Sequence, residues 1–161
     1  MPGQPVPAGI APVRVAEGHA SREHGRRERT RAALAGLARA RTALAEASEV
    51  PAAGSRYLAA HDAALRVAAV VLALRARPSR AERPRNAWRL LAEVAPELSE
   101  WASFFAATQH RRDALRAGVP GLVGGAEADA LLRDAERFLA LVEQAVAPPG
   151  PGSRQAAERA P

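Results

Sequence analysis

The sequence predicts an all-α protein, an up-and-down bundle of four long helices with one short extra helix. Apolar residues recur at three- and four-residue steps through the middle of the chain, as they do along one face of an α-helix. No stretch alternates apolar and polar residues in the way that a half-buried strand does. Short loops separate the predicted helices, so consecutive helices should pack antiparallel.

Both ends of the chain are predicted to lie outside the bundle and to be disordered. Residues 1–28 contain four prolines and scattered charges without an apolar period, and residues 148–161 form a polar tail rich in proline. Such segments bury too little apolar surface to offset the entropy that ordering would cost. The 161 residues therefore hold one domain, expected at residues 29–147.

The first two helices are predicted at residues 30–48 and 55–75. The inward face of the first contains Ala33, Leu34, Leu37, Ala40, Leu44 and Ala47. Pro51 and Gly54 separate the two helices, and Ser55 is a candidate N-cap for the second. More than half of the circumference of the second helix is apolar, so we expect it to lie at the centre of the bundle.

The remaining helices follow an arginine-rich loop predicted at residues 76–84. A short third helix is expected from Asn86, and a fourth begins afresh at Pro96, because proline fits the first turn of a helix and not its interior. Arg116 lies in the last turn of the fourth helix, before Gly118. The fifth helix, at residues 126–147, has the most regular apolar face.

The basic charge of the chain consists entirely of arginine. All 23 cations are Arg, which is typical of a very GC-rich genome, and the high isoelectric point of about 11.3 does not by itself require a nucleic-acid partner. One local excess lies between Arg75 and Arg89, where six arginines face the single acid Glu82. This segment is either a phosphate-binding surface or a solvated loop. A second basic run, at residues 22–31, is either a binding arm or a solvated approach to the first helix.

Composition also excludes several classes of protein. The absence of cysteine excludes a disulfide framework, and the four histidines do not have the spacing of metal ligands. There is no glycine-rich phosphate loop, no signal-peptide pattern and no apolar run as long as a membrane span. We therefore expect a cytoplasmic protein without metal, cofactor or membrane partner.

Four of the six aromatic residues fall close together, at Trp88, Trp101, Phe104 and Phe105. Such a cluster at helical spacing predicts a core. Consecutive phenylalanines cannot both face inward, so one of the two is predicted to be an exposed contact for a partner or a second copy of the chain.

Three segments together resemble a known family. They are YLAAHDAALR at residues 57–66, RNAW at residues 85–88 and PELSEWASFF at residues 96–105. Over residues 30–147 the chain resembles a small stand-alone actinobacterial branch of the HEPN superfamily. The resemblance implies a helical bundle that forms a homodimer, and that either cleaves RNA without a metal or only binds RNA or a nucleotide.

The nuclease signature of HEPN domains is an arginine, often followed by a polar residue, with a histidine a few residues further along. Arg85 and Asn86 match its first half, but leucine and alanine occupy the positions where the histidine belongs. Arg56 and His61 have the right spacing, with Tyr57 in place of the polar residue. His61 also lies on the apolar face of its helix, which favours a hydrogen-bonded core histidine over a catalytic base.

The leading functional prediction is a HEPN-like module that binds RNA or a nucleotide and does not cleave it. The predicted binding residues are Arg77, Arg80, Arg83, Arg85, Asn86 and Arg89. One alternative is a toxin-like, metal-independent endoribonuclease that uses Arg56 and His61. Another is a helical adaptor that contacts a partner protein through Trp101, Phe104 and Phe105.

Overall fold

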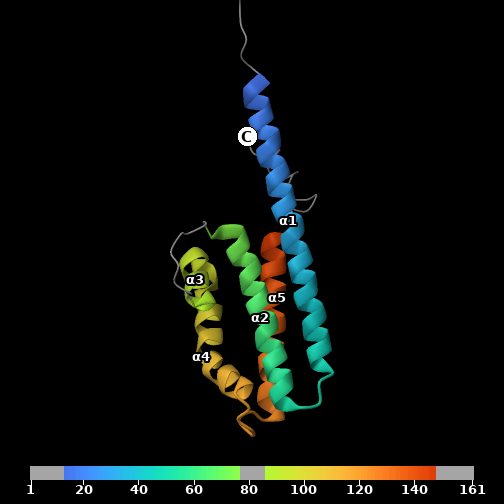
Figure 1. Ribbon diagram of the computed structural model, residues 1–161, viewed down its shortest axis with the longest axis vertical. Helices are drawn as coiled ribbons and strands as arrows, with labels where there is room; N and C mark the ends of the chain where they lie inside the picture. The colour runs from blue at the N-terminus through green and yellow to red at the C-terminus, as the bar shows by residue number, and fades with distance from the viewer. Residues whose placement is uncertain (1–12, 77–85, 148–161) are drawn as a thin grey trace, which may run out of the picture.

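The computed structural model describes residues 13–76 and 86–147, and every regular element within them is helical (Figure 1). In chain order these are α1 (Val13–Ser48), α2 (Ala53–Arg75), α3 (Ala87–Val94), a single 3-10 turn η1 (Pro96–Leu98), α4 (Ser99–Arg116) and α5 (Gly125–Val146). The predicted all-α class is confirmed, with four long helices and one short one. Residues 148–161 lie outside the described part of the chain, so the expectation for the C-terminal tail stays a prediction.

The helices form an up-and-down bundle with α2 at its centre. Helices α1, α2 and α5 pack together, and the α3–η1–α4 segment covers another side of α2 (Figure 1). Among the described residues, α2 is the one helix long and apolar enough to cross a membrane by composition. Because α2 packs against α1, α3, α4 and α5, this apolar character is accounted for by its central position in the bundle.

Helix α1 begins at Val13, well before the predicted start at residue 30. Residues 13–28 are thus helical where disorder was expected, whereas residues 1–12 lie outside the described residues. The prediction required an apolar face, but adding turns to a helix already held by packing costs little. Pairs one turn apart support these turns, such as His24 with Glu28 at 3.2 Å.

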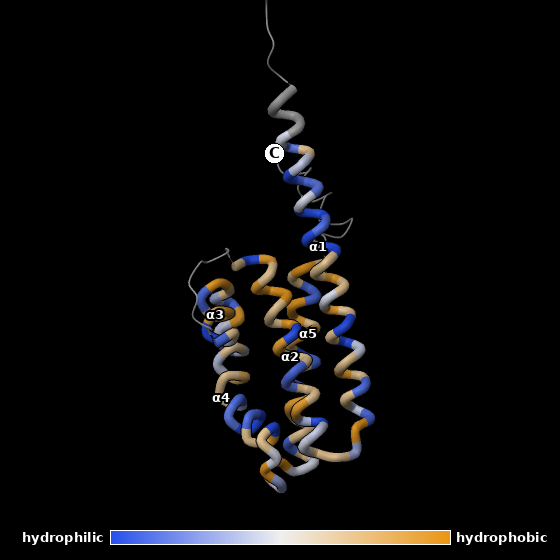
Figure 2. The backbone as a smooth tube through the Cα atoms, viewed as in Figure 1, coloured by the Kyte–Doolittle hydropathy of each residue, from blue (hydrophilic) through white to orange (hydrophobic). Residues whose placement is uncertain are grey.

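The first part of α1, Val13–Arg31, projects beyond the bundle, and we call it the arm (Figure 1). Its described residues are mostly hydrophilic, whereas apolar residues concentrate in the bundle (Figure 2). Among residues 18–48 of α1, whose burial is described, the first buried side chain is Ala33. The arm therefore contributes nothing to the described core.

Most of the other helix ends lie where they were predicted. Helices α1 and α2 end at Ser48 and Arg75, and Asn86 caps α3 by accepting a hydrogen bond from the backbone N–H of Trp88 at 2.9 Å. The chain breaks at Pro96 as expected, and Gly118 has a φ of +83°, which glycine adopts without strain. The predicted N-cap Ser55 is wrong: α2 begins at Ala53, and Ala52 caps it without a side-chain hydrogen bond.

The core combines small alanines with a few large side chains. The largest fully buried side chains include Trp88, Tyr57, Phe105 and Phe138. Alanines bring α1 and α2 close together, and at Gly36 the approach is closer still. A Cβ at Gly36 would lie 2.7 Å from Cγ2 of Val70. Only a hydrogen atom fits there.

We expect Gly36→Ala to lower the free energy of unfolding by about 1–3 kcal/mol, because the added methyl group overlaps Val70. This figure is the net loss, after the roughly 1 kcal/mol that alanine gains over glycine inside a helix has been subtracted from the steric cost. Urea unfolding followed by circular dichroism would measure it. Gly25→Ala is the matched control, since nothing lies within 4 Å of a Cβ there.

The pair Gly36→Ala/Val70→Ala should be nearly as stable as Val70→Ala alone, because the smaller side chain at position 70 makes room for the methyl group. A Gly36→Ala protein as stable as the native chain would contradict the close approach of α1 and α2.

Candidate functional site

Arg56, one of the two candidate catalytic residues, lies in the first turn of α2 and is engaged on two sides. Its Nε is 2.8 Å from Oδ1 of Asp129 in α5, and only 12% of the side chain is exposed. Its Nη1 donates hydrogen bonds to the backbone carbonyls of Val50 and Pro51. Arg56 thus ties the α1–α2 connection to α5.

His61 is completely buried on the other side of α2. Its ring meets those of Trp88 and Phe105 edge-on, with centroids 5.8 Å and 6.0 Å away. Nε2 lies 3.2 Å from the carbonyl oxygen of Phe105, and because a carbonyl only accepts, Nε2 carries the proton. Burial lowers the pKa of His61, which favours the neutral ring. The prediction of a hydrogen-bonded core histidine is confirmed.

The structure does not bring Arg56 and His61 together. Five residues along a helix turn the side-chain direction by about 140°. Arg56 accordingly reaches α5 and the α1–α2 connection, while His61 contacts α3 and α4. A proton shuttle must touch its substrate, and none of the His61 side chain is exposed.

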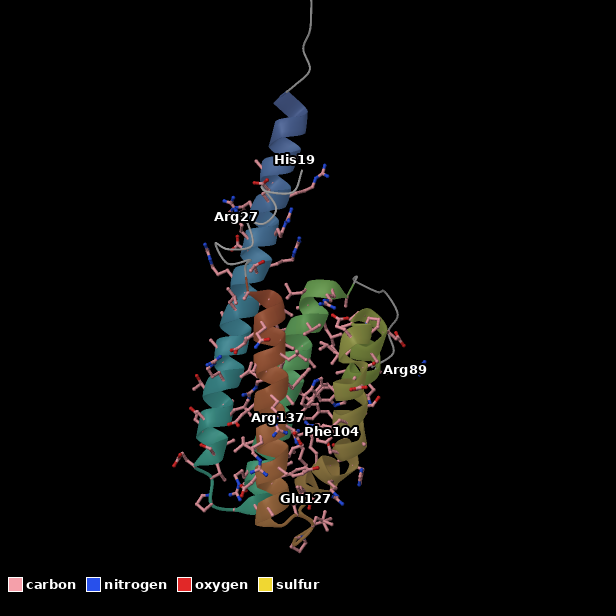
Figure 3. The ribbon with its side chains drawn as sticks, turned by 180° about the vertical axis from the view of Figure 1, so that it is seen from behind. His19, Arg27, Arg89, Phe104, Glu127 and Arg137 are labelled. Carbon is pink, nitrogen blue, oxygen red and sulfur yellow. The ribbon has the colours of Figure 1, made fainter. Side chains whose placement is uncertain are left out.

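Only part of the predicted phosphate-binding segment falls within the described residues. Arg77, Arg80, Arg83 and Arg85 lie outside them. Arg89 is exposed on α3, where it pairs with Glu93 at 3.3 Å (Figure 3). The Asn86 amide is occupied by its capping bond, and Arg75, just before the segment, pairs with Glu97.

The aromatic cluster forms part of the core, as predicted. Trp88 stacks on Phe105 at 4.9 Å between ring centroids, and Phe138 of α5 packs against both rings. Phe105 is buried, whereas 38% of Phe104 is exposed. The expectation that one of the two consecutive phenylalanines faces outward is confirmed.

An ion-pair network missed in the sequence joins α2 to α4. Asp62 accepts hydrogen bonds from Arg112 at 2.9 Å and from Arg116 at 2.7 Å. Burial would raise the pKa of Asp62, but these bonds and the two positive charges outweigh it and lower the pKa. In the sequence, the only hint of this network was that Arg112 and Arg116 lie one helical turn apart, so that both can reach the same carboxylate. Arg112 also pairs with Asp113 at 3.1 Å, so the network holds two carboxylates and two guanidinium groups.

A second feature missed in the sequence is a groove between α1 and α2, which we call the α1–α2 groove. It has a volume of about 460 Å³, and three arginines line it: Arg29, Arg39 and Arg66. Its walls otherwise consist of apolar and small residues, including Gly36, Val70 and Leu74. The signal in the sequence was the set of small residues at helical spacing in the first helix.

Within residues 13–76 and 86–147, no three histidine, aspartate or glutamate side chains gather closely enough to hold a metal ion. The charged side chains of the described surface instead form pairs and small networks.

Comparison of the sequence with curated proteins and with solved structures gives no match. A family model described as SAV_6107-like HEPN matches residues 45–143. The match runs from the last turn of α1 to the last turn of α5 and covers more than half of the chain. It agrees with the all-helical architecture of the bundle. The chain therefore belongs to the SAV_6107-like family of HEPN domains.

Proposed function

We propose that this HEPN domain is an RNA-binding module that holds its ligand through arginine–phosphate contacts and does not cleave it. The observation that carries the proposal is the arm, a polar helix that projects from the bundle and packs against none of its described core (Figure 1). The described side chains of residues 18–31 lie outside the core, so the polar surface of the arm is open to a ligand.

The charge of the arm fits a phosphate ligand. Its sequence contains six arginines and three glutamates. The two described ion pairs within it, Glu23 with Arg27 and His24 with Glu28, are more than half exposed, and pairs of that kind contribute little energy. His19 and Arg27 lie well away from the bundle (Figure 3). The guanidinium groups of the arm are therefore accessible to a polyanion.

A second basic segment is anchored at the same end of the bundle. Thr30, near the base of the arm, and Arg75, at the end of α2, line one hollow of about 390 Å³. The chain continues from Ala76 into the segment that contains Arg77, Arg80, Arg83 and Arg85. We include these four arginines, with Arg89, in the proposed RNA surface.

The engagement of Arg56 and the burial of His61 support binding rather than cleavage. Arg56 is held by Asp129, and His61 is enclosed by aromatic rings. A nuclease that used this pair would have to expose His61, which means separating α3 and α4 from α2. The adaptor alternative has weaker support, since Phe104 is the one clearly exposed ring of the described aromatic cluster.

The test is the affinity of the full chain for a fluorescein-labelled single-stranded RNA, measured by anisotropy at several salt concentrations. Arg26→Glu/Arg27→Glu should weaken binding by about tenfold or more and should flatten the dependence of affinity on salt, because fewer counterions are released. Arg80→Glu/Arg83→Glu should have a similar effect. Arg133→Glu/Arg137→Glu, on the exposed side of α5, reverses as many charges elsewhere and is the control.

Equal losses in the arm and control variants would contradict a localised surface. Absence of binding, or binding insensitive to salt, would sink the proposal altogether. Incubation of the RNA with the protein in EDTA distinguishes RNA binding from metal-independent RNA cleavage. Intact RNA is expected, and cleavage would favour the endoribonuclease alternative.

A further inference from the structure

The α1–α2 groove gathers arginines that have no carboxylate partner among the described residues. Most other arginines of the described bundle pair with a carboxylate, namely Arg41, Arg56, Arg75, Arg89, Arg111, Arg112, Arg116 and Arg137. Among the described residues, no carboxylate lies within ion-pair distance of Arg39 or Arg66, and both side chains are exposed beside the groove. Arg133 of α5 is also exposed without such a pair, but it stands apart from the groove, whereas Arg39 and Arg66 line it together.

The groove is long and has cations at both ends. On α1 its lining runs from Arg29 to Arg39, a distance of about 15 Å at 1.5 Å per residue. Because α1 and α2 are antiparallel, Arg66 lies near the Arg39 end, and Leu74 lies near the Arg29 end. The Arg39 side chain turns back along α1, and its Nη2 is 3.8 Å from the position that a Cβ on Gly36 would take. Positive charge therefore lies beside the apolar floor as well as at the ends of the groove.

The middle of the groove is built from small residues. Ala32, Ala33, Gly36, Ala69 and Ala73 line it, and Val70 supplies the larger apolar surface. Small side chains on two adjacent helices let a third helix lie close against both. Among the described residues, the only hydrogen-bonding side chains that line this groove are its three arginines.

We propose that the α1–α2 groove binds an acidic amphipathic helix of a partner protein. The apolar face of the helix would cover Val70 and the alanines, as in other helix-in-groove complexes. Its carboxylates would meet Arg29 at one end and Arg39 with Arg66 at the other. The partner helix would therefore carry acidic residues toward both of its ends.

A strand of nucleic acid fits this groove less well. Phosphates follow one another along the whole backbone and are matched by a continuous row of cations. Here three arginines accompany a floor of alanines, Gly36, Val70 and Leu74, and they do not form a continuous row. The arm, by contrast, is mostly hydrophilic along its described length (Figure 2). The arm and the groove meet at Arg29 and differ in apolar character on either side of it, so they suit different ligands.

The probe for the test is a displayed library of synthetic helices about 18 residues long, enough to span the groove. A leucine and alanine stripe is fixed, and the flanking positions vary among Glu, Gln and Lys. The library is selected on the full chain and counter-selected on Ala69→Trp, which fills the floor from an exposed position of α2. Ala73→Trp serves in its place if the first variant does not fold by circular dichroism.

The expected result is enrichment of Glu near both ends of the selected helices. A selected peptide should bind Ala69→Trp and Arg39→Glu/Arg66→Glu about tenfold or more weakly than the native chain. Ala107→Trp, at an exposed position of α4, and Arg133→Glu/Arg137→Glu are the matched controls and should bind normally. A peptide with Lys in place of its selected Glu residues should bind the Arg39→Glu/Arg66→Glu chain better than the native one, because the charges are then exchanged.

Selection without Glu enrichment, or peptides that bind the filled variant equally well, would overturn the proposal. The RNA assay separates it from the proposed function: Arg39→Glu/Arg66→Glu should leave RNA affinity unchanged. If this pair weakens RNA binding as much as the arm variant does, the groove belongs to the RNA surface and the partner-helix proposal fails. A loss of RNA binding in the arm variant has no bearing on the peptide result.

Discussion

Replacing Trp88 by alanine is expected to lower the free energy of unfolding by about 3–5 kcal/mol, the range found for large aromatic residues removed from a core. Only 1% of Trp88 is exposed, and its ring stacks on Phe105 and contacts His61 and Phe138. It is the largest buried side chain of α3 and holds that short helix against α2 and α4. Urea unfolding followed by circular dichroism would measure the loss.

Phe104→Ala is the matched control for Trp88→Ala, because 38% of Phe104 is exposed and a smaller loss should follow. Trp88→Phe should fall between the two, since it keeps an aromatic ring in the cluster. It also removes an indole N–H that has no hydrogen-bond partner among the described residues. A Trp88→Ala chain about as stable as the Phe104→Ala chain would show that α3 is not held through this ring.

The second large effect is expected on acidification and arises at His61. In the unfolded chain a histidine binds a proton with a pKa of about 6.5. Burial lowers the pKa of His61 in the folded protein, so it takes up its proton only at lower pH. Between these two values the unfolded chain carries more protons, and the free energy of unfolding falls as the pH falls. One such group gives a slope of at most about 1.4 kcal/mol per pH unit.

Other charged groups surround the junction of α2 and α4, and their contribution to the pH dependence of stability must be distinguished from that of His61. Asp62 and Asp113 favour the charged ring and Arg112 disfavours it, but burial is the larger influence. Urea midpoints between pH 8 and pH 5 would be compared for the native chain, His61→Gln and His110→Gln. His110→Gln, at an exposed position, is the matched control, and His61→Gln should flatten the curve.

If His61→Gln is too unstable to compare, the ring can be observed directly in the native protein. The proton resonances of His61 should stay those of a neutral imidazole at pH values just below the ordinary histidine pKa of about 6.5. A His61 ring that titrates at this ordinary value would contradict its enclosure in the core.

The sequence was sufficient for most of the fold because its local signals agree with its tertiary structure. Proline at residue 96 and asparagine at residue 86 each mark a helix start by backbone chemistry that operates locally. The apolar period placed His61 on the buried face, and the adjacent rings of Phe104 and Phe105 could only divide between core and surface. The three segments that resemble HEPN domains pointed to the same superfamily as the family match.

The candidate site was less predictable because it depends on which helices lie next to one another. That Arg112 and Arg116 meet Asp62, while Arg39 and Arg66 meet no described carboxylate, follows from helix packing and not from spacing along the chain. Arg56 matched a catalytic spacing in the sequence, yet its environment is set by Asp129 on a distant helix. The start of α1 was missed for a different reason, since its first turns continue a packed helix without having an apolar face.

The single helix α1 should show two very different rates of amide hydrogen exchange. From Ala33 onward its peptide groups are held by the packing of the bundle, and they exchange only when α1 separates from α2 and α5. The turns before that residue can open one after another from the free end without disturbing any buried side chain. A peptide ligand in the α1–α2 groove would slow exchange in the part of α1 that follows Ala33. RNA bound to the arm would slow exchange in the turns before Ala33, so that one helix reports separately on the two ligands.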